Sequence, residues 1–289
     1  MEWKTNITEM LGCKYPIIQG AFAGIGKADL AAPVSEAGGF GIITGHNFKT
    51  AELLREEIHR AREMTKNNFG INFTIIPPRF NEAHYKDMVE VVIDEGIGTV
   101  FTSAYKAKNI GERLHSGGVN WIHKCATMKH AISACSHGVD AVVIVGIEGT
   151  GFKNPKQNTT LVNMVMANRT IDVPFIAAGG IGDAHGLLGA LGMGAEAVYL
   201  GTSFMSVKEC PTSEKFKERM IDQDCFDEEF YSKIYHHEAR DSGVPSMAVG
   251  TIEEVLSAKE LIDGIISESE KILRGWGFTG DCLDTTKKP

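Results

Sequence analysis

The sequence predicts a (β/α)8 barrel of the TIM type, followed by a C-terminal extension over one rim. Three observations predict this fold: eight short apolar runs, amphipathic stretches between them, and glycine-rich turns after the last two runs. The chain has 289 residues, and one such barrel typically takes roughly 250. Hydrophobic residues make up 43% of the chain, which is enough to build a sizeable core.

The eight runs are the expected barrel strands. Near-continuous apolar runs are typical of a parallel sheet, which is covered on both faces. An open doubly wound sheet is the alternative, but its glycine fingerprint should follow the first strand, with an acidic residue after the second. Here the first run leads into GAFAGIG without a fitting acidic residue, which favours the barrel. The runs are Pro16–Gly20, Gly39–Thr44, Phe69–Ile76, Gly98–Ser103, Val119–Cys125, Asp140–Gly146, Val173–Gly180 and Glu196–Thr202.

Amphipathic stretches and a break in the repeat set the remaining organisation. Residues 1–205 are expected to form the barrel, residues 206–250 an irregular extension or lid, and residues 251–289 a helix and tail packed on the barrel. The clearest helix signal starts at Thr251, which would form a capping box with Glu254, and ends at Gly275. Helices are also predicted at Lys27–Gly38, Thr50–Met64, Glu82–Gly96 and Met128–Gly138.

Charge and cysteine usage exclude several classes of function. The net charge of −8 argues against a nucleic-acid partner, since phosphate backbones require clustered Lys and Arg. No apolar run approaches the ~20 residues of a membrane span. The six cysteines show no metal-ligand spacing, so no metal site is expected and the thiols should be free in a reducing cytoplasm. The expected partner is a small-molecule substrate, and a homo-oligomer is left open.

Two late glycine turns are the strongest functional signal. The seventh run ends in Gly179 and Gly180, and the eighth ends in Gly201 and Thr202. In a barrel these turns are neighbours, and phosphate commonly binds the backbone amides of the loops after strands seven and eight. Glycine permits the close approach of phosphate oxygens because it lacks a Cβ. The residues alone therefore predict a phosphorylated ligand without identifying it.

Polar residues at the ends of the early and middle strands predict a second part of the site. Gln19 and Gly20 end the first run, Asn72 lies on the third, and Lys124 lies on the fifth. Side chains at these ends point into the barrel mouth, where a lysine could hydrogen-bond a flavin ring and stabilise its reduced anion. The neighbouring His123 should face the opposite side of its strand and pack under a helix.

Seven segments of the sequence resemble the nitronate monooxygenase family, formerly called 2-nitropropane dioxygenases. They are YPIIQGAFAGIG, AGGFGIITG, FGINFTIIP, IHKCATMKHA, GVDAVVIVG, VPFIAAGGIGDAHG and GAEAVYLGTSFM, in the family's order. The third and fourth are most similar to the FMN-dependent NADH:quinone reductase branch, and FMN-dependent enoyl-ACP reductases are further relatives. The resemblance implies non-covalent FMN, with phosphate at the two glycine turns and ring or ribityl contacts from Gln19, Gly20, Ala21, Asn72 and Lys124.

One position departs from the family pattern. After strand six the family usually reads G-x-E-x-G-G-H, and its histidine faces the flavin, whereas this chain has Phe152 at that position. Phe152 and Thr150 are expected to line the substrate pocket, but phenylalanine cannot transfer a proton. Glu148 in the same loop and His46 after strand two are the candidate replacements, each with a structural interpretation as the alternative. His236 and His237 in the extension are weaker candidates.

Four functions remain open from the sequence. The first is an FMN-dependent oxidoreductase of the nitronate monooxygenase type that acts on a small organic substrate. The second is an NAD(P)H-dependent quinone or enoyl reductase on the same barrel, a hypothesis that the missing histidine favours. The others are a flavin-binding protein without catalysis and a barrel enzyme that uses another phosphorylated ligand.

Overall fold

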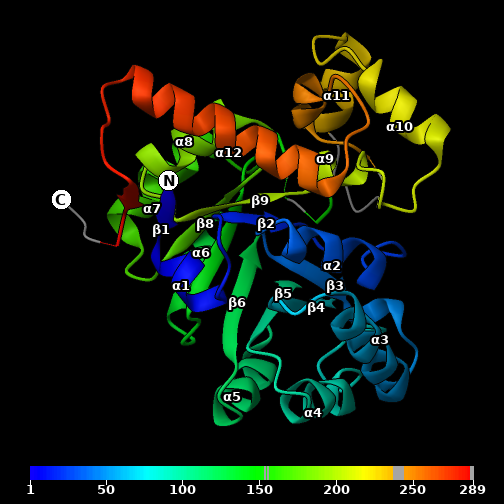
Figure 1. The fold of residues 1–289 in the computed structure, drawn as a ribbon. Coiled ribbons are helices and arrows are strands. Elements are labelled where there is room, and N and C mark those ends of the chain that lie inside the picture. The colour runs from blue at the N-terminus through cyan, green and yellow to red at the C-terminus, as the bar shows by residue number, and fades with distance from the viewer. Residues whose placement is uncertain (153, 155, 237–243, 287–289) are drawn as a thin grey trace.

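The computed structural model describes residues 1–152, 154, 156–236 and 244–286. Eight parallel strands form the predicted barrel, in the order β2-β9-β8-β7-β6-β5-β4-β3. A parallel bridge between Ile18 and Phe40 joins the two end strands. The (β/α)8 prediction is confirmed, and all eight predicted strands are present (Figure 1). They are β2 (Ile17–Gln19), β3 (Gly41–Thr44), β4 (Phe69–Ile75), β5 (Thr99–Ala104), β6 (Asn120–Cys125), β7 (Ala141–Val145), β8 (Phe175–Ala178) and β9 (Ala197–Leu200).

Side chains alternate between the inside of the barrel and the helices outside it. The interior is filled by one apolar cluster that includes Ile18, Phe101, Ile122 and Tyr199. Residues of the opposite parity, such as Val142, pack in a second cluster beneath the helices. Because both faces of the sheet are covered, the strands read as near-continuous apolar runs.

Gln19 completes the seam between β2 and β3. The backbone N–H of Gln19 donates to the carbonyl of Phe40 at 2.9 Å, after which the regular ladder stops. The side-chain amide then takes over: its oxygen accepts from the N–H of Ile42 at 3.1 Å, and its NH₂ donates to the Ile42 carbonyl at 3.2 Å and to the carbonyl of Gly20. The fully buried Gln19 side chain therefore replaces a missing peptide of the ladder.

We expect Gln19→Leu to lower the free energy of unfolding by about 1–3 kcal/mol, because the N–H and C=O of Ile42 would be left buried without partners. Urea unfolding of the cofactor-free protein measures this effect without any contribution from ligand binding. An unchanged midpoint would show that the seam does not depend on the Gln19 amide.

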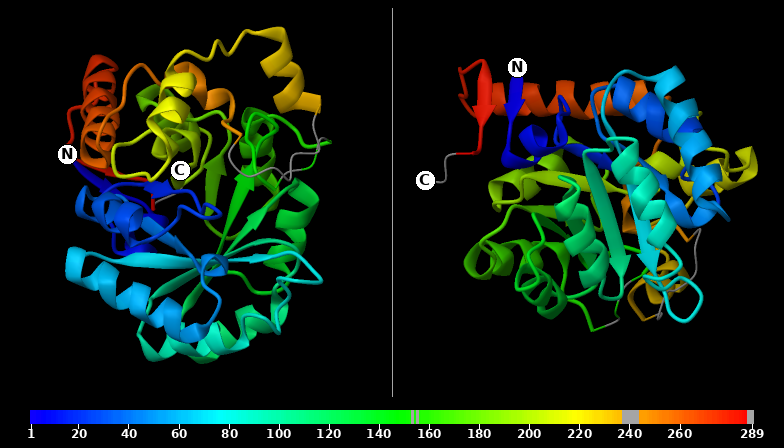
Figure 2. Two further views of the ribbon diagram at one scale, coloured as in Figure 1. Left: turned by 90° about the vertical axis from the view of Figure 1, so that its right-hand side faces the viewer. Right: turned by 90° about the horizontal axis from the view of Figure 1, so that it is seen from below.

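The N-terminal residues, which the sequence left unassigned, close the bottom of the barrel. Helix α1 (Asn6–Leu11) inserts Ile7 and Leu11 into the interior cluster. Strand β1 (Glu2–Lys4) pairs in parallel with β10 (Cys282–Asp284), so the first and the last strand of the described residues lie side by side (Figure 2). The N-terminus therefore belongs to the barrel core.

Seven helices on the outside follow the barrel strands. They are α2 (Ala28–Glu36), α3 (Ala51–Met64), α4 (Lys86–Asp94), α5 (Lys108–Ser116), α6 (Met128–Cys135), α7 (Thr160–Thr170) and α8 (Ala184–Gly192). The four helices predicted between the runs are present with shorter ends, and Thr50 caps α3 as its position suggests. Helices α5 and α7 were not predicted.

The C-terminal helix α12 (Ala258–Gly275) serves as the eighth barrel helix, because it packs against α8 and α2 (Figure 1). The prediction that it starts at Thr251 is wrong. Its capping box is formed by Ser257 and Glu260, a second match to the same S/T-x-x-E pattern further along the chain. Thr251 ends the short 3₁₀ helix η2 (Met247–Thr251), and Ile252 packs away from the helix, against residues of the extension.

The segment 206–250 is not irregular throughout, which corrects that expectation. It contains α10 (Glu214–Ile221) and α11 (Glu228–His236) after the short α9 (Thr202–Met205). Its returning end lies on the C-terminal rim: Met247 N–H donates to Glu148 O at 3.1 Å, and Thr150 Oγ1 donates to Val244 O at 2.8 Å. The extension therefore lies over the rim at the end of β7.

All six cysteines are unpaired, as expected. Among the helices of the described ranges, none combines the length and apolar character that a membrane crossing requires. In the same residues no group of three or more His, Cys, Asp or Glu is placed to hold a metal ion.

Candidate functional site at the C-terminal mouth

The two predicted glycine bends lie next to each other. Strands β8 and β9 pair with Ala178 opposite Tyr199, so Gly179 and Gly180 adjoin the end of β9. Both glycines have positive φ, +101° and +71°, which disfavours any side chain at these positions. A Cβ added at Gly201 would meet only Phe22, at 3.9 Å, so space is open beside this bend.

Thr202 connects the second bend to the extension. Its hydroxyl lies 2.7 Å from Ser246 Oγ and accepts the backbone N–H of Ser246 at 2.8 Å. The side chain of Thr202 is thus used within the protein. The hydroxyl of neighbouring Ser203 is buried and has no partner within the described parts of the chain.

A row of inward-facing polar residues lines the opposite wall of the mouth. Thr74, Ser103 and Lys124 stand at one level on β4, β5 and β6, because the register pairs Thr74 with Ser103 and Ser103 with Lys124. Ser103 donates to Thr74 Oγ1 at 3.1 Å, and the Asn72 amide donates to the same oxygen at 2.9 Å. The Asn72 Oδ1 atom is buried without a partner among the described residues. Ser103 was missed, although its alternation with inward Phe101 could have revealed it.

Lys124 is the charged group of this row. Burial lowers its pKa to about 8, and no carboxylate in the described residues offsets this effect. An enclosed cation without a counter-ion is costly for the protein alone, and a bound anion or acceptor would relieve the cost. Asn72 and Lys124 therefore present an unused acceptor and an unpaired cation in one part of the mouth.

The remaining predicted residues of the first strand border this mouth from the other side. Gly20 donates its N–H to Leu200 O at 2.7 Å, and Ala21 donates its N–H to Tyr199 Oη at 2.7 Å. A Cβ on Gly20 would lie 3.1 Å from the Cα of Gly201, so the end of β2 lies directly against the second glycine bend.

Glu148 caps a helix. Its carboxylate accepts from the Thr160 N–H at 2.9 and 3.1 Å and from the Thr160 hydroxyl at 2.9 Å, at the start of α7. These contacts agree with the structural alternative, in which Glu148 holds the start of α7. None of them supports a role for Glu148 in proton transfer.

We expect Glu148→Ala to lower the free energy of unfolding by about 1 kcal/mol, as loss of a helix cap does. Glu148→Gln should recover most of this loss, because an amide oxygen still accepts from the Thr160 N–H. Thermal unfolding of the two variants side by side tests this, and equal destabilisation by both would show that the charge matters more than the cap.

His46 lies after β3, in the 3₁₀ helix η1 (Gly45–Asn47). Its ring packs against Phe80 with 5.5 Å between centroids, and its Nδ1 is buried without a partner in the described residues. Burial, and to a smaller extent the neighbouring His84, lowers the pKa of His46 and favours the neutral ring. Of the weaker candidates, His236 is exposed at the end of α11, and His237 lies outside the described residues.

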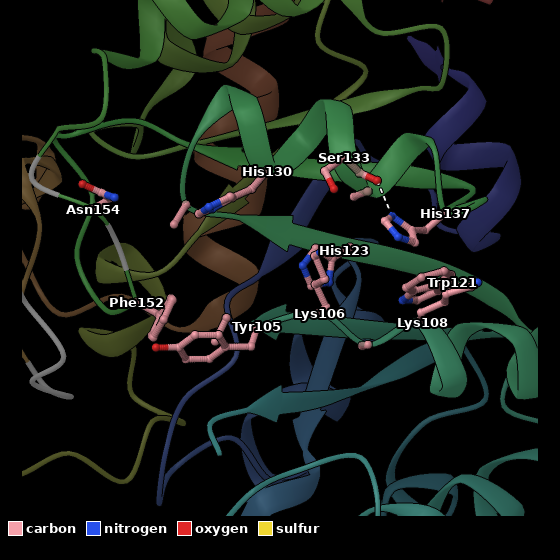
Figure 3. Close-up of a pocket in the computed structure, with 14 residues that line it drawn as sticks. Tyr105, Lys106, Lys108, Trp121, His123, His130, Ser133, His137, Phe152 and Asn154 are labelled. Carbon is pink, nitrogen blue, oxygen red and sulfur yellow. Dashed lines mark hydrogen bonds between the residues drawn. The ribbon is translucent and has the colours of Figure 1, made fainter. Parts of the chain in front are cut away.

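Phe152 lines a cavity, but this cavity is outside the barrel. It has a volume of about 380 Å³ and lies between the outer face of β6 and helix α6 (Figure 3). Phe152 forms an edge-on contact with Tyr105, with 5.5 Å between ring centroids. Thr150 does not line this cavity and instead bonds to the extension. His123 is buried on the outer face of β6, as the alternation predicts.

In barrels of this architecture catalytic groups lie at the C-terminal strand ends, and two buried polar atoms without partners among the described residues, Asn72 Oδ1 and Ser203 Oγ, lie there in this chain, as in an enzyme of the (β/α)8 class. The chain belongs to the nitronate monooxygenase family, whose profile matches residues 4–244. It is therefore an oxidoreductase of a flavin-dependent family.

Individual relatives agree with this assignment. A probable nitronate monooxygenase from Staphylococcus aureus (strain JH9) is 31% identical over 257 residues, which covers 75% of this chain and 72% of that protein. FabK from Thermotoga maritima matches 94% of this chain and 99% of its own, with a TM-score of 0.82 and 28% identity. A nitroalkane oxidase from Streptomyces ansochromogenes shares the fold, with a TM-score of 0.78, 20% identity, and 93% and 99% coverage.

Proposed function

We propose that this protein binds FMN across the barrel mouth and oxidises preformed nitronate anions. The bends at Gly179–Gly180 and Gly201–Thr202 would hold the phosphate, since they are adjacent and open beside Gly201. Lys124 and Asn72 would meet the ring, because both carry polar capacity that the described residues leave unused. When bound, FMN would accept one or two electrons from the substrate.

The identity of residue 152 supports the choice of an anionic substrate. Removal of a proton from a neutral nitroalkane requires a base, and phenylalanine occupies the position where the family has histidine. Glu148 is engaged by α7, and the other described residues of the loop after β7 include no histidine or carboxylate. A nitronate has already lost this proton, so its oxidation needs positioning and charge complementarity, which Lys124 supplies.

The test compares a nitronate with its neutral parent. The purified flavin-containing protein is mixed without oxygen with propyl-2-nitronate or with neutral 2-nitropropane, and the loss of flavin absorbance is followed. We expect the nitronate to bleach the flavin and the neutral compound to react at least about a hundredfold more slowly, the lower end of the range for loss of general-base catalysis. Equal rates for both compounds would refute the proposed dependence on a preformed anion.

An NAD(P)H-dependent reductase is the second candidate, with a quinone or an activated C=C bond as acceptor. Two observations support it: hydride transfer from a nicotinamide needs no base at residue 152, and 28% identity relates the chain to FabK over most of its length. NADH and NADPH are therefore included in the same anaerobic experiment. Bleaching by either nucleotide, with the nitronate inert, would replace the first proposal by the second.

A further inference from the structure

The cavity between β6 and α6, which we call the β6–α6 cavity, carries positive and hydrogen-bonding groups that the proposed reaction does not use. Its volume of about 380 Å³ falls within the ~300–1,000 Å³ range of ligand pockets. Tyr105 and Phe152 lie at one end, Trp121 and His137 at the other, and His123 lies between them (Figure 3).

The floor of the cavity is a buried chain of three hydrogen-bonding groups. The Trp121 indole N–H, which can only donate, lies 2.7 Å from Thr102 Oγ1. The Thr102 hydroxyl keeps its own proton to donate, and the Nδ1 atom of His123 lies 2.7 Å away on its other side. Nδ1 of His123 is thus assigned as the acceptor.

This assignment places the single proton of His123 on Nε2. Burial lowers the pKa of His123 to about 4, so the ring is neutral near pH 7. The side chain is 6% exposed and lines the cavity, and no described residue accepts from Nε2. The structure therefore holds an unpartnered N–H donor, more than nine-tenths buried, in the wall of an open cavity.

The charged residues among the described lining of the cavity are lysines. Lys106 and Lys108 lie at the edge of the cavity, where Lys108 Nζ is paired with Glu112 at 3.5 Å, and His130 and His137 contribute further imidazole rings from the side of α6. No Asp or Glu occurs among the described lining residues. Cationic side chains and an N–H donor complement an anion, whereas the rings of Trp121, Tyr105 and Phe152 complement a flat apolar body.

We propose that the β6–α6 cavity is a binding site for a small aromatic carboxylate. One carboxylate oxygen accepts from the Nε2–H of His123, Lys106 at the edge balances the charge, and the ring of the ligand packs against Trp121. The site lies outside the barrel mouth and does not depend on the chemistry proposed for the flavin.

The test is calorimetric titration of the flavin-containing protein with benzoate, using benzamide as the uncharged analogue of the same shape. We expect benzoate to bind at least about tenfold more tightly, because benzamide lacks the charge that Lys106 complements. Ser133→Leu should weaken benzoate binding by about tenfold or more, since Ser133 lines the cavity from α6 and a larger side chain would fill it.

A matched pair of lysine variants keeps the test valid if Ser133→Leu perturbs folding. Lys106→Ala removes a lining charge and should weaken benzoate binding severalfold. Lys129→Ala removes an exposed charge of α6 that does not line the cavity and should leave binding unchanged. Three results would overturn the proposal: no binding of benzoate, equal binding of benzamide, or benzoate binding that neither Ser133→Leu nor Lys106→Ala weakens.

Discussion

Gly179→Ala should abolish retention of the flavin, with an affinity loss of about a hundredfold or more. At φ = +101° an alanine is strained, and its Cβ would lie 3.1 Å from the N and O atoms of Gly146 and from the N atom of Gly149. These are backbone atoms of the loop after β7, so the two loops must separate. Backbone strain of this kind costs about 1–3 kcal/mol, and the displaced bend would no longer present its amides to a phosphate. Flavin released on denaturation, measured per mole of purified protein, reports the effect.

Gly189→Ala is the matched control. Gly189 is exposed in the middle of α8, and a Cβ there meets nothing within 4 Å. This change should stabilise the protein by about 0.5–1 kcal/mol through helix propensity and leave the flavin content unaltered. If Gly179→Ala retained as much flavin as Gly189→Ala, the proposed phosphate site would be wrong.

Lys124→Met should have opposite effects on the cofactor-free and the flavin-containing protein. Without cofactor, removal of a partly buried and unpaired cation should raise the free energy of unfolding by about 1–3 kcal/mol at pH 7. With FMN bound, loss of the charge should destabilise the reduced anionic flavin by about tenfold relative to the oxidised form. A tenfold change lowers a two-electron reduction potential by about 30 mV, which anaerobic titration against a reference dye measures.

The pH dependence of the stability difference identifies its cause. The folded-state pKa of Lys124, about 8, lies below the ordinary value of 10.5, so the unfolded chain binds more protons between these pH values. The free energy of unfolding of the wild type should therefore rise relative to that of Lys124→Met as the pH increases from about 8 to about 10.5. Below pH 8 the full penalty remains, because both states are protonated. A stability difference that stays constant up to pH 10.5 would exclude the charge as its origin, and an unchanged flavin potential would mean that Lys124 does not contact the ring.

Local patterns were sufficient for the strands and for the positions of the glycine bends. A parallel strand covered on both faces must be apolar along its length, and the positive φ angles at Gly179 and Gly180 favour glycine, so both features leave direct marks in the sequence. Thr50 likewise marked the start of α3, because a capping side chain bonds to residues of its own helix.

The sequence by itself thus determined the barrel, the family and the side of the fold on which the site lies. Both Thr251 and Ser257 fit the same capping pattern, so only the tertiary structure decided which of them starts α12. Ile252 packs against residues of the extension, and the helix starts after Ser257. It also assigned Gln19 to the β2–β3 seam, Glu148 to the start of α7, and His123 to a cavity outside the barrel. Each of these roles depends on a partner distant in sequence, and spacing along one chain carries no information about such partners.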